Sequence, residues 1–90
     1  MKRFRSGETV TACRFVSKHE DRLEFHKLRA MKSHLNWYWA NKDENLMIVS
    51  IPGICIILKE FLGRDGRYVK VASQSDAKIY NVPVNMAWRI

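Results

Sequence analysis

The sequence predicts an α+β fold in which one amphipathic helix packs on an antiparallel β-meander of three to four strands. Three observations lead to this prediction: a β-branched segment near the N-terminus, a stretch of helical periodicity after it, and two turn signals between apolar segments in the second half. With 90 residues, 47% of them hydrophobic, the chain can bury one core, so we expect a single domain over residues 1–90. A small SH3-like barrel with a much shorter helix is the alternative.

A first strand is expected at residues 9–16, whose sequence TVTACRFV is rich in β-branched and aromatic residues. A helix should begin near Lys18, because Ser17 and Glu20 have the S-x-x-E spacing of a capping box. When the following residues are placed at 100° steps, the apolar ones gather on one helix face. That face carries Phe25, Leu28, Met31, Leu35, Tyr38 and Trp39.

The end of this helix is expected between Leu35 and Asn41. The segment NWYWAN is rich in aromatic residues, which favour strands, so it also fits a strand with Trp37 and Trp39 on one face. In that alternative the residues NKDEN form the loop of a hairpin and the helix is shorter.

Two turn signals divide the second half of the chain. Pro52-Gly53 suits the two central positions of a type II turn, where Pro fixes φ and Gly accepts a positive φ. Asp65-Gly66 is the strong signal for a two-residue hairpin. The segments around these turns therefore predict an antiparallel meander.

Tight turns would also fix which side chains share a face of the sheet. Val49 would pair with Ile56 across the first turn, and Arg64 with Arg67 across the second. One face is then apolar and is expected to lie against the helix. The other face mixes apolar, aromatic and basic side chains, namely Ile48, Ser50, Cys55, Ile57, Lys59, Phe61, Tyr68, Lys70 and Ala72.

The end of the chain predicts one more strand, because residues 82–90 alternate between two faces. Pro83 cannot donate a ladder hydrogen bond, so this strand is expected to start at a sheet edge. The side chains on its apolar face are Val82, Val84, Met86, Trp88 and Ile90.

The composition is strongly basic, with 16 Lys and Arg against 9 Asp and Glu and a net charge of +7. A positive field of this size favours nucleic acid or an acidic protein surface as the partner. A membrane partner is not expected. The longest apolar run, residues 46–58, is interrupted by Pro52-Gly53 and is shorter than the roughly 20 residues that span a bilayer.

Cys13 and Cys55 are isolated in apolar segments, so we expect reduced, buried thiols. Lys2, Arg3 and Arg5 are followed by polar residues and not by the apolar core of a signal peptide. We therefore expect a protein of the cytoplasm, its own cell's or a host's.

Motifs for catalysis, metals or cofactors are lacking, so a non-enzymatic protein without a cofactor is expected. His19 and His26 would lie about two helical turns, or roughly 10 Å, apart, which is too far to share a metal ion. No nucleophile motif and no Gly-rich phosphate loop occurs. A small ribonuclease that uses His26 or His34 is the least favoured of three hypotheses.

The most informative pattern is the interleaving of basic and aromatic residues around the second turn. On one sheet face, aromatic rings can stack on bases while cations hold phosphates. The turn requires Asp65-Gly66 but not an arginine on either side, so the two arginines are not explained by folding alone. The predicted binding residues for nucleic acid or an acidic partner are Lys59, Phe61, Arg64, Arg67, Tyr68 and Lys70. Nucleic-acid binding is the first functional hypothesis.

The helix supplies a second candidate surface. Its polar face carries Arg22, His26 and Arg29, and an apolar stripe of Leu23, Ala30 and Trp37 recurs every seven residues beside it. Such a stripe can anchor a protein partner while the basic surface meets an acidic groove. The second hypothesis is therefore a small modulator or inhibitor of another protein, of the kind that phages and mobile elements encode.

Overall fold

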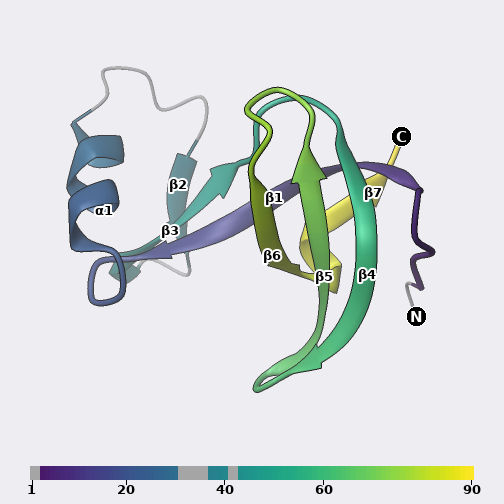
Figure 1. The fold of residues 1–90 in the computed structure, drawn as a ribbon. Coiled ribbons are helices and arrows are strands. Elements are labelled where there is room, and N and C mark those ends of the chain that lie inside the picture. The colour runs from purple at the N-terminus through teal and green to yellow at the C-terminus, as the bar shows by residue number, and fades with distance from the viewer. Residues whose placement is uncertain (1–2, 31–36, 41–42) are drawn as a thin grey trace. The chain divides into compact units, whose positions relative to one another are not determined.

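The computed structural model describes residues 3–30, 37–40 and 43–90, which form two compact units. The first unit comprises the chain up to Arg14 and from Ile51 onward, and the second comprises Phe15–Ser50. The described residues are mostly antiparallel β-sheet with one short α-helix (Figure 1). The elements are β1 (Thr9–Ser17), α1 (Arg22–Arg29), β2 (Trp37–Ala40), β3 (Asp43–Ser50), β4 (Cys55–Gly63), β5 (Gly66–Ser73), β6 (Ile79–Pro83), the 3₁₀ turn η1 (Val84–Met86) and β7 (Ala87–Arg89).

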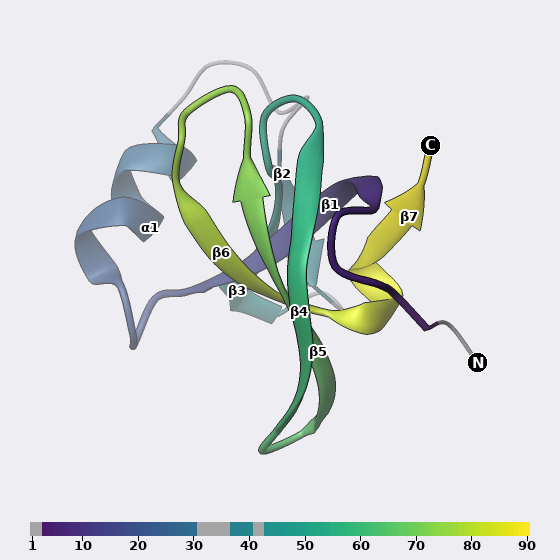
Figure 2. The same ribbon diagram turned by 45° about the vertical axis from the view of Figure 1, so that its right-hand side comes forward.

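Within the first unit, antiparallel pairing joins the strands in the order β7, β1, β4, β5 and β6. The 3₁₀ turn η1 leads from β6 back to β7, which pairs with β1. Figures 1 and 2 show that β4 and β5 form a long, curved hairpin. A curved sheet connected in this way is compatible with the SH3-like barrel that the sequence left as the alternative.

The core of the first unit lies inside this curved sheet. Burial of its apolar side chains gives the sheet its main stabilisation, roughly 1.5–3 kcal/mol for each fully buried large residue. Burial also raises the pKa of the Cys55 thiol, whereas Cys13 is only partly buried and does not meet the expectation of a buried thiol. The buried residues are Phe4, Val10, Ala12, Ile51, Cys55, Ile57, Val69, Val71, Val82, Val84 and Ala87.

The second unit contains α1, β2, β3 and the end of β1. Its small core consists of Val16, Phe25, Met47 and Val49, with Leu28 packed against them. Phe25 and Leu28 therefore point inward, as the helical periodicity predicted. The expected packing of the helix on the meander is not confirmed, because the core around Phe25 contains side chains of β1 and β3.

The helix begins later than predicted. Asp21 is its N-cap, and the Asp21 carboxylate accepts a hydrogen bond from the backbone N–H of Glu24 at 3.2 Å. Ser17 instead closes β1, and its Oγ accepts from the backbone N–H of His19 at 3.2 Å. The sequence contains two overlapping capping signals, and an aspartate at N-cap is at least as favourable as a serine.

The helix also ends earlier than predicted, at Arg29, with Ala30 as its C-cap. Residues 37–40 form β2 and pair with β3, so the strand alternative for NWYWAN is right and a helix through these residues is wrong. Tyr38 and Trp39 are thus not on a helix face. Met31 and Leu35 lie outside the described residues. The high strand propensity of the aromatic segment explains the difference.

The first turn does not make the predicted hairpin. Gly53 has the positive φ that the turn signal indicated, +69°. Nevertheless β4 pairs with β1, placing Val10 opposite Cys55, while β3 is bordered by β2 and β1. The expected pairing of Val49 with Ile56 is therefore wrong. The backbone just before this turn is instead hydrogen-bonded to β1, because the Ile51 N–H donates to the Ala12 carbonyl at 2.9 Å.

The end of the chain is also more broken than predicted. Residues 82–90 do not form one strand, because η1 interrupts them between β6 and β7. The alternation is lost at this point: Val84 and Ala87 are both buried, whereas Trp88 and Ile90 are 43% and 72% exposed. None of the helices in the described segments is long and apolar enough to cross a membrane.

Candidate nucleic-acid interface

The β4–β5 hairpin positions the aromatic and basic residues that the sequence singled out. Its register places Gly63 opposite Gly66 and Phe61 opposite Tyr68. The turn is therefore Arg64-Asp65, one residue before the predicted Asp65-Gly66, and Arg64 does not face Arg67. Gly66 has a φ of +132°, which L-residues rarely adopt, so the glycine fixes where the turn ends.

A register irregularity in β4 determines which side chains face the core. The register shifts between Ile57, which pairs with Val71, and Lys59, which pairs with Lys70. Because of this bulge, Cys55 and Ile57 turn into the core, although they were predicted on the same face as Lys59. The bulge thus separates an apolar half of β4 from a half with a basic and aromatic outer surface.

The opposite side of β4, β5 and β6 forms a second surface, which we call the outer face. Lys59 and Asn81 are exposed on it, whereas Phe61, Tyr68 and Lys70 are half-buried. Its residues follow from the pairing of the three strands: Ile56, Lys59, Phe61, Gly63, Tyr68, Lys70, Ala72, Ile79, Asn81 and Pro83.

Two aromatic rings lie next to each other on the outer face. The rings of Phe61 and Tyr68 are stacked, with centroids 5.8 Å apart and planes 23° from parallel. Gly63 makes room for them: a Cβ at this position would lie 2.5 Å from Cδ1 and 2.6 Å from Cε1 of Tyr68. The glycine is therefore required by the close approach of a ring.

Two lysines stand beside the rings. Lys59 and Lys70 are direct cross-strand neighbours, and the Nζ of Lys59 lies 6.0 Å from the centroid of Phe61. Like charges placed opposite each other on two strands repel. Neither lysine forms an ion pair with a residue in the described parts of the chain, and the outer face carries no carboxylate. The pair therefore lowers the stability of this part of the sheet.

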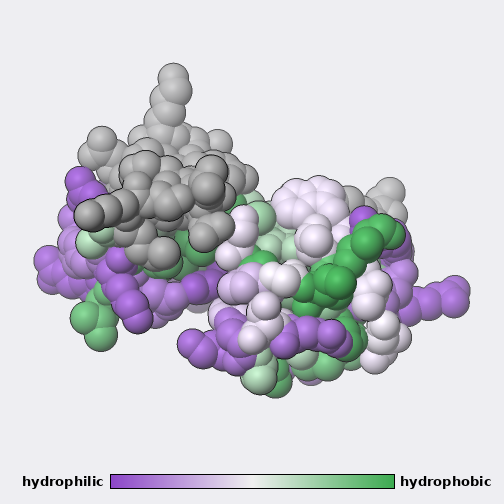
Figure 3. Space-filling model, turned by 90° about the horizontal axis from the view of Figure 1, so that it is seen from above, coloured by the Kyte–Doolittle hydropathy of each residue, from purple (hydrophilic) through white to green (hydrophobic). Residues whose placement is uncertain are grey.

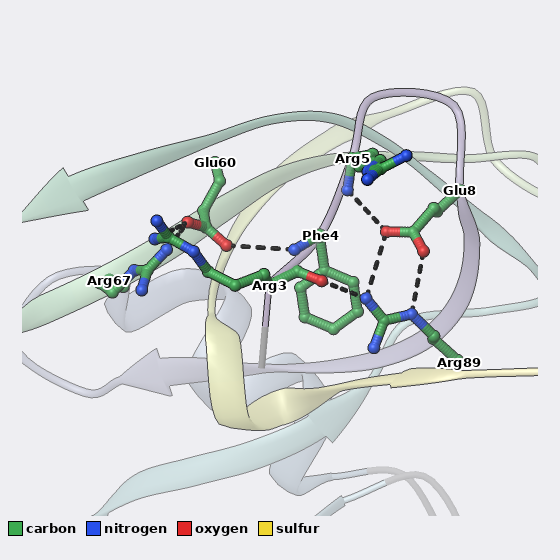
Figure 4. A network of polar contacts seen from close by, with 7 residues as sticks. All are labelled: Arg3, Phe4, Arg5, Glu8, Glu60, Arg67 and Arg89. Atoms are coloured by element: carbon green, nitrogen blue, oxygen red, sulfur yellow. Dashed lines mark hydrogen bonds and ion pairs between the residues drawn. The ribbon is translucent and has the colours of Figure 1, made fainter. Parts of the chain in front are cut away.

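Arg67, in contrast, does not belong to the outer face. It pairs with Leu62 on the other side of the hairpin and forms an ion pair with Glu60 (Figure 4). Glu60 also accepts from the guanidinium of Arg3 and from the backbone N–H of Phe4, both at 3.3 Å. Arg67 is thus explained by folding. Arg64 lies exposed in the turn.

A second carboxylate ties the two ends of the first unit together (Figure 4). Glu8 accepts from Arg89 Nε at 2.9 Å and from the backbone N–H of Arg5 at 2.6 Å. The Arg89 hydrogen bond, followed by that of Arg5, lowers the pKa of Glu8. Arg89 also donates to the Arg3 carbonyl and stands 4.7 Å from the Phe4 ring centroid. This cluster has a structural role.

The excess positive charge is concentrated in the unit that carries the outer face. The first unit contains ten Lys and Arg and four Asp and Glu, a net charge of +6. The second contains six and five, a net charge of +1. Within the first unit, Glu8 and Glu60 bind arginines and Asp76 accepts from Tyr80. The outer face therefore lies in the more positive field.

The helix residues singled out from the sequence belong to the second unit. Arg22, His26 and Arg29 are exposed and share one side of α1. Leu23 is 84% exposed, but the predicted stripe is not formed, because Ala30 caps the helix and Trp37 lies in β2. The use of these residues to anchor a protein partner stays a prediction. His34 lies outside the described residues.

Other exposed apolar side chains occur on the first unit, including Leu62 at 80% and Ile79 at 62%. In the view of Figure 3, hydrophobic side chains reach the surface next to hydrophilic ones. Within residues 3–30, 37–40 and 43–90, no group of three or more His, Cys, Asp or Glu side chains could hold a metal ion.

Two residues of the outer face, Gly63 and Asn81, are not among those that the sequence pattern predicts. Gly63 was not recognised, although a glycine diagonal to an aromatic residue across a hairpin is a usable signal. Asn81 was missed because the last strand was expected to begin at residue 82, whereas β6 begins at Ile79. Asn81 pairs with Lys70 and is exposed.

No protein-family model, curated protein or solved structure matches this chain significantly. The geometry of the outer face is therefore the basis for a functional assignment.

Proposed function

We propose that this protein binds nucleic acid through the outer face of β4, β5 and β6. The ligand's phosphates contact Lys59 and Lys70, its bases contact the Phe61 and Tyr68 rings, and Arg64 in the turn supplies a further cation. The proposal requires no catalytic step and no cofactor.

The observation that carries the proposal is the Lys59–Lys70 pair beside the stacked rings. Two lysines opposite each other lower the stability of the free sheet, so packing and pairing within the fold do not account for them. A phosphate array removes the repulsion, and each neutralised phosphate releases condensed counterions. The aromatic neighbours distinguish this surface from a merely basic one, because rings add stacking to the charge.

The hairpin is also accessible to a long ligand. The last pair between β5 and β6 is Tyr68 with Pro83, so the end of the hairpin that contains Arg64 projects beyond β6 (Figures 1 and 2). A polyanion lying on the outer face can therefore continue past the rings to the turn.

Fluorescence anisotropy with a labelled oligonucleotide tests the proposal. We expect the logarithm of the association constant to fall linearly with the logarithm of the salt concentration. The double variant Lys59→Ala, Lys70→Ala should bind more weakly and have a slope smaller by about 1.4 to 1.8, the value for two lost phosphate contacts.

The matched control is Lys18→Ala, Lys27→Ala, which removes the same charge from the second unit. If both double variants lose affinity equally, only the net charge matters and the outer face is not the site. If the unaltered protein binds no oligonucleotide at low salt, the proposed function is wrong.

A further inference from the structure

Building on the proposed function, we infer that the ligand of the outer face is single-stranded and that its unpaired bases stack on the Tyr68 and Phe61 rings. The chemical class is thus a flexible polyphosphate chain with accessible base faces, either RNA or DNA. This inference adds a ligand class and a contact mode to the proposal.

The rings are the first argument. Phe61 and Tyr68 are partly exposed and occupy the middle of the hairpin's outer surface. In a duplex the faces of the bases are covered by their neighbours, so rings on the surface of a sheet cannot reach them. In a single strand the base faces are open, and one stacked base typically contributes a factor of roughly 5 to 150 in affinity.

The placement of Gly63 is the second argument. The absence of a Cβ lets the Tyr68 ring lie across the neighbouring strand, where even a methyl group would come within 2.5 Å of it. The ring is thereby held close to the sheet next to Phe61 instead of projecting into solvent. A preorganised aromatic surface loses little side-chain freedom when a base stacks on it.

The number and position of the cations are the third argument. On one side of the rings, Lys59 Nζ lies 6.0 Å from the Phe61 centroid, and on the other side Arg64 lies in the turn that follows Gly63. A single-stranded nucleic acid that crosses the two rings therefore meets a cation on each side of them. With Lys70 the surface offers three cations, which is fewer than the roughly 6 to 10 phosphates that a strongly salt-dependent duplex binder contacts.

Asn81 completes the surface. It lies on β6 directly opposite Lys70 and is exposed, so its amide offers hydrogen-bond donors and an acceptor on the same face as the rings. The Watson–Crick edges of unpaired bases present complementary donors and acceptors, which a duplex already uses in base pairing.

A comparison of binding to single-stranded and double-stranded oligonucleotides tests the inference. Anisotropy is measured at low salt with a labelled oligo(dT) of about twelve nucleotides, the matching oligo(U), and a twelve-base-pair duplex, each with the intact protein. We expect at least one single strand to bind about tenfold or more tightly than the duplex. Phe61→Ala, Tyr68→Ala should weaken single-strand binding at least fivefold and weaken duplex binding by a smaller factor.

The possible results separate the two proposals. Equal or tighter binding of the duplex, or a ring variant that retains single-strand affinity, overturns the inference while nucleic-acid binding stands. Failure of all three probes to bind overturns the proposed function together with the inference.

A second readout covers the case in which the ring variant folds poorly. The fluorescence of a 2-aminopurine placed within the oligo(dT) changes when this base stacks on an aromatic ring. Adding the unaltered protein should therefore change the signal, and the ring variant is not needed for this measurement. Tyr68→Phe preserves the ring and should preserve this change. An unaltered 2-aminopurine signal at saturating protein contradicts stacking.

Discussion

Tyr68 shows how a single residue of the outer face depends on its neighbour. Its ring lies over Gly63 and beside Phe61, so its position is set by a missing Cβ and by a ring contact. The backbone of Gly63 does not require a glycine through its φ angle, since the described glycines with positive φ are Gly7, Gly53 and Gly66. The glycine is therefore best understood as a positioning residue for Tyr68.

Gly63→Ala is predicted to displace the Tyr68 ring and to weaken single-strand binding roughly fivefold, the effect of losing about 1 kcal/mol of stacking. The fold should survive, because a half-buried ring at the surface can rotate away. Anisotropy measures the loss. In the Tyr68→Ala background the same change should have no further effect, and an equal loss there would show that Gly63 acts independently of the ring.

Asp76 connects the β5–β6 loop to β6 through its carboxylate. Tyr80 Oη donates to it at 2.6 Å and the backbone N–H of Lys78 donates at 3.0 Å. These hydrogen bonds, that of Tyr80 first, lower the pKa of Asp76. The Asp76 carboxylate therefore binds a proton less readily in the folded state than in the unfolded state.

The lowered pKa gives a pH-dependent contribution to stability. It is fully present above the ordinary aspartate pKa near 3.9 and is lost as the pH falls through the lower folded value. Asp76→Asn should therefore lower the melting temperature at pH 7, and the difference from the unaltered protein should shrink towards pH 2. A difference that stays constant over this range would contradict the assignment.

At the scale of elements, the bulge in β4 decides which residues stabilise the first unit. It turns Ile57, which is fully buried, into the core and leaves Leu58 38% exposed. The strict alternation expected from the sequence gives the reverse assignment. The alternation of side chains along a sequence does not reveal a bulge. One extra residue exchanges the two faces of the strand beyond it, so the alternation predicts the wrong face there.

Ile57→Ala is predicted to lower the free energy of unfolding by about 2–5 kcal/mol, as for other large-to-small changes in a core. Leu58→Ala should cost less than about 1 kcal/mol, because the side chain is already partly in water. Urea denaturation measures both values. A larger loss of unfolding free energy for Leu58→Ala than for Ile57→Ala would indicate a β4 without a bulge and would contradict the structure.

The start of α1 provides a similar comparison between two residues. Asp21→Ala should reduce stability by about 1 kcal/mol, because it removes the acceptor for the Glu24 N–H. Ser17→Ala should have a smaller effect, since Ser17 lies in β1 and does not cap the helix. Denaturation followed by circular dichroism distinguishes them, and the opposite order would support a helix that begins near Lys18.

For the whole molecule, the sequence predicted local features better than their connections. The first strand, the inward face of Phe25 and Leu28, and the β4–β5 hairpin were predicted from periodicity and turn chemistry. The pairing of β1 with β4 was not, because residues 9–10 and 55–56 are distant in the sequence and no local signal specifies their contact. The expectation of one domain over residues 1–90 stays a prediction.

The candidate site was predictable to a similar degree. The shared face of Lys59, Phe61, Tyr68 and Lys70 followed from alternation near one turn, and a shift of the turn by one residue preserves the faces of both strands. Arg67 was predicted to face Arg64 at the turn, whereas it lies opposite Leu62 and forms an ion pair with Glu60. The unexplained like charges are accordingly Lys59 and Lys70, rather than the arginines.

A protein of 10.6 kDa is well suited to NMR, and a titration of the ¹⁵N-labelled chain with a short oligo(dT) tests the central claim most directly. We predict that the largest amide shifts occur at Lys59, Phe61, Tyr68 and Lys70, with smaller ones at Arg64 and Asn81, and that amides of α1 barely move. Shifts confined to α1, or no shifts at saturating oligonucleotide, would contradict the assignment of the outer face as a nucleic-acid interface.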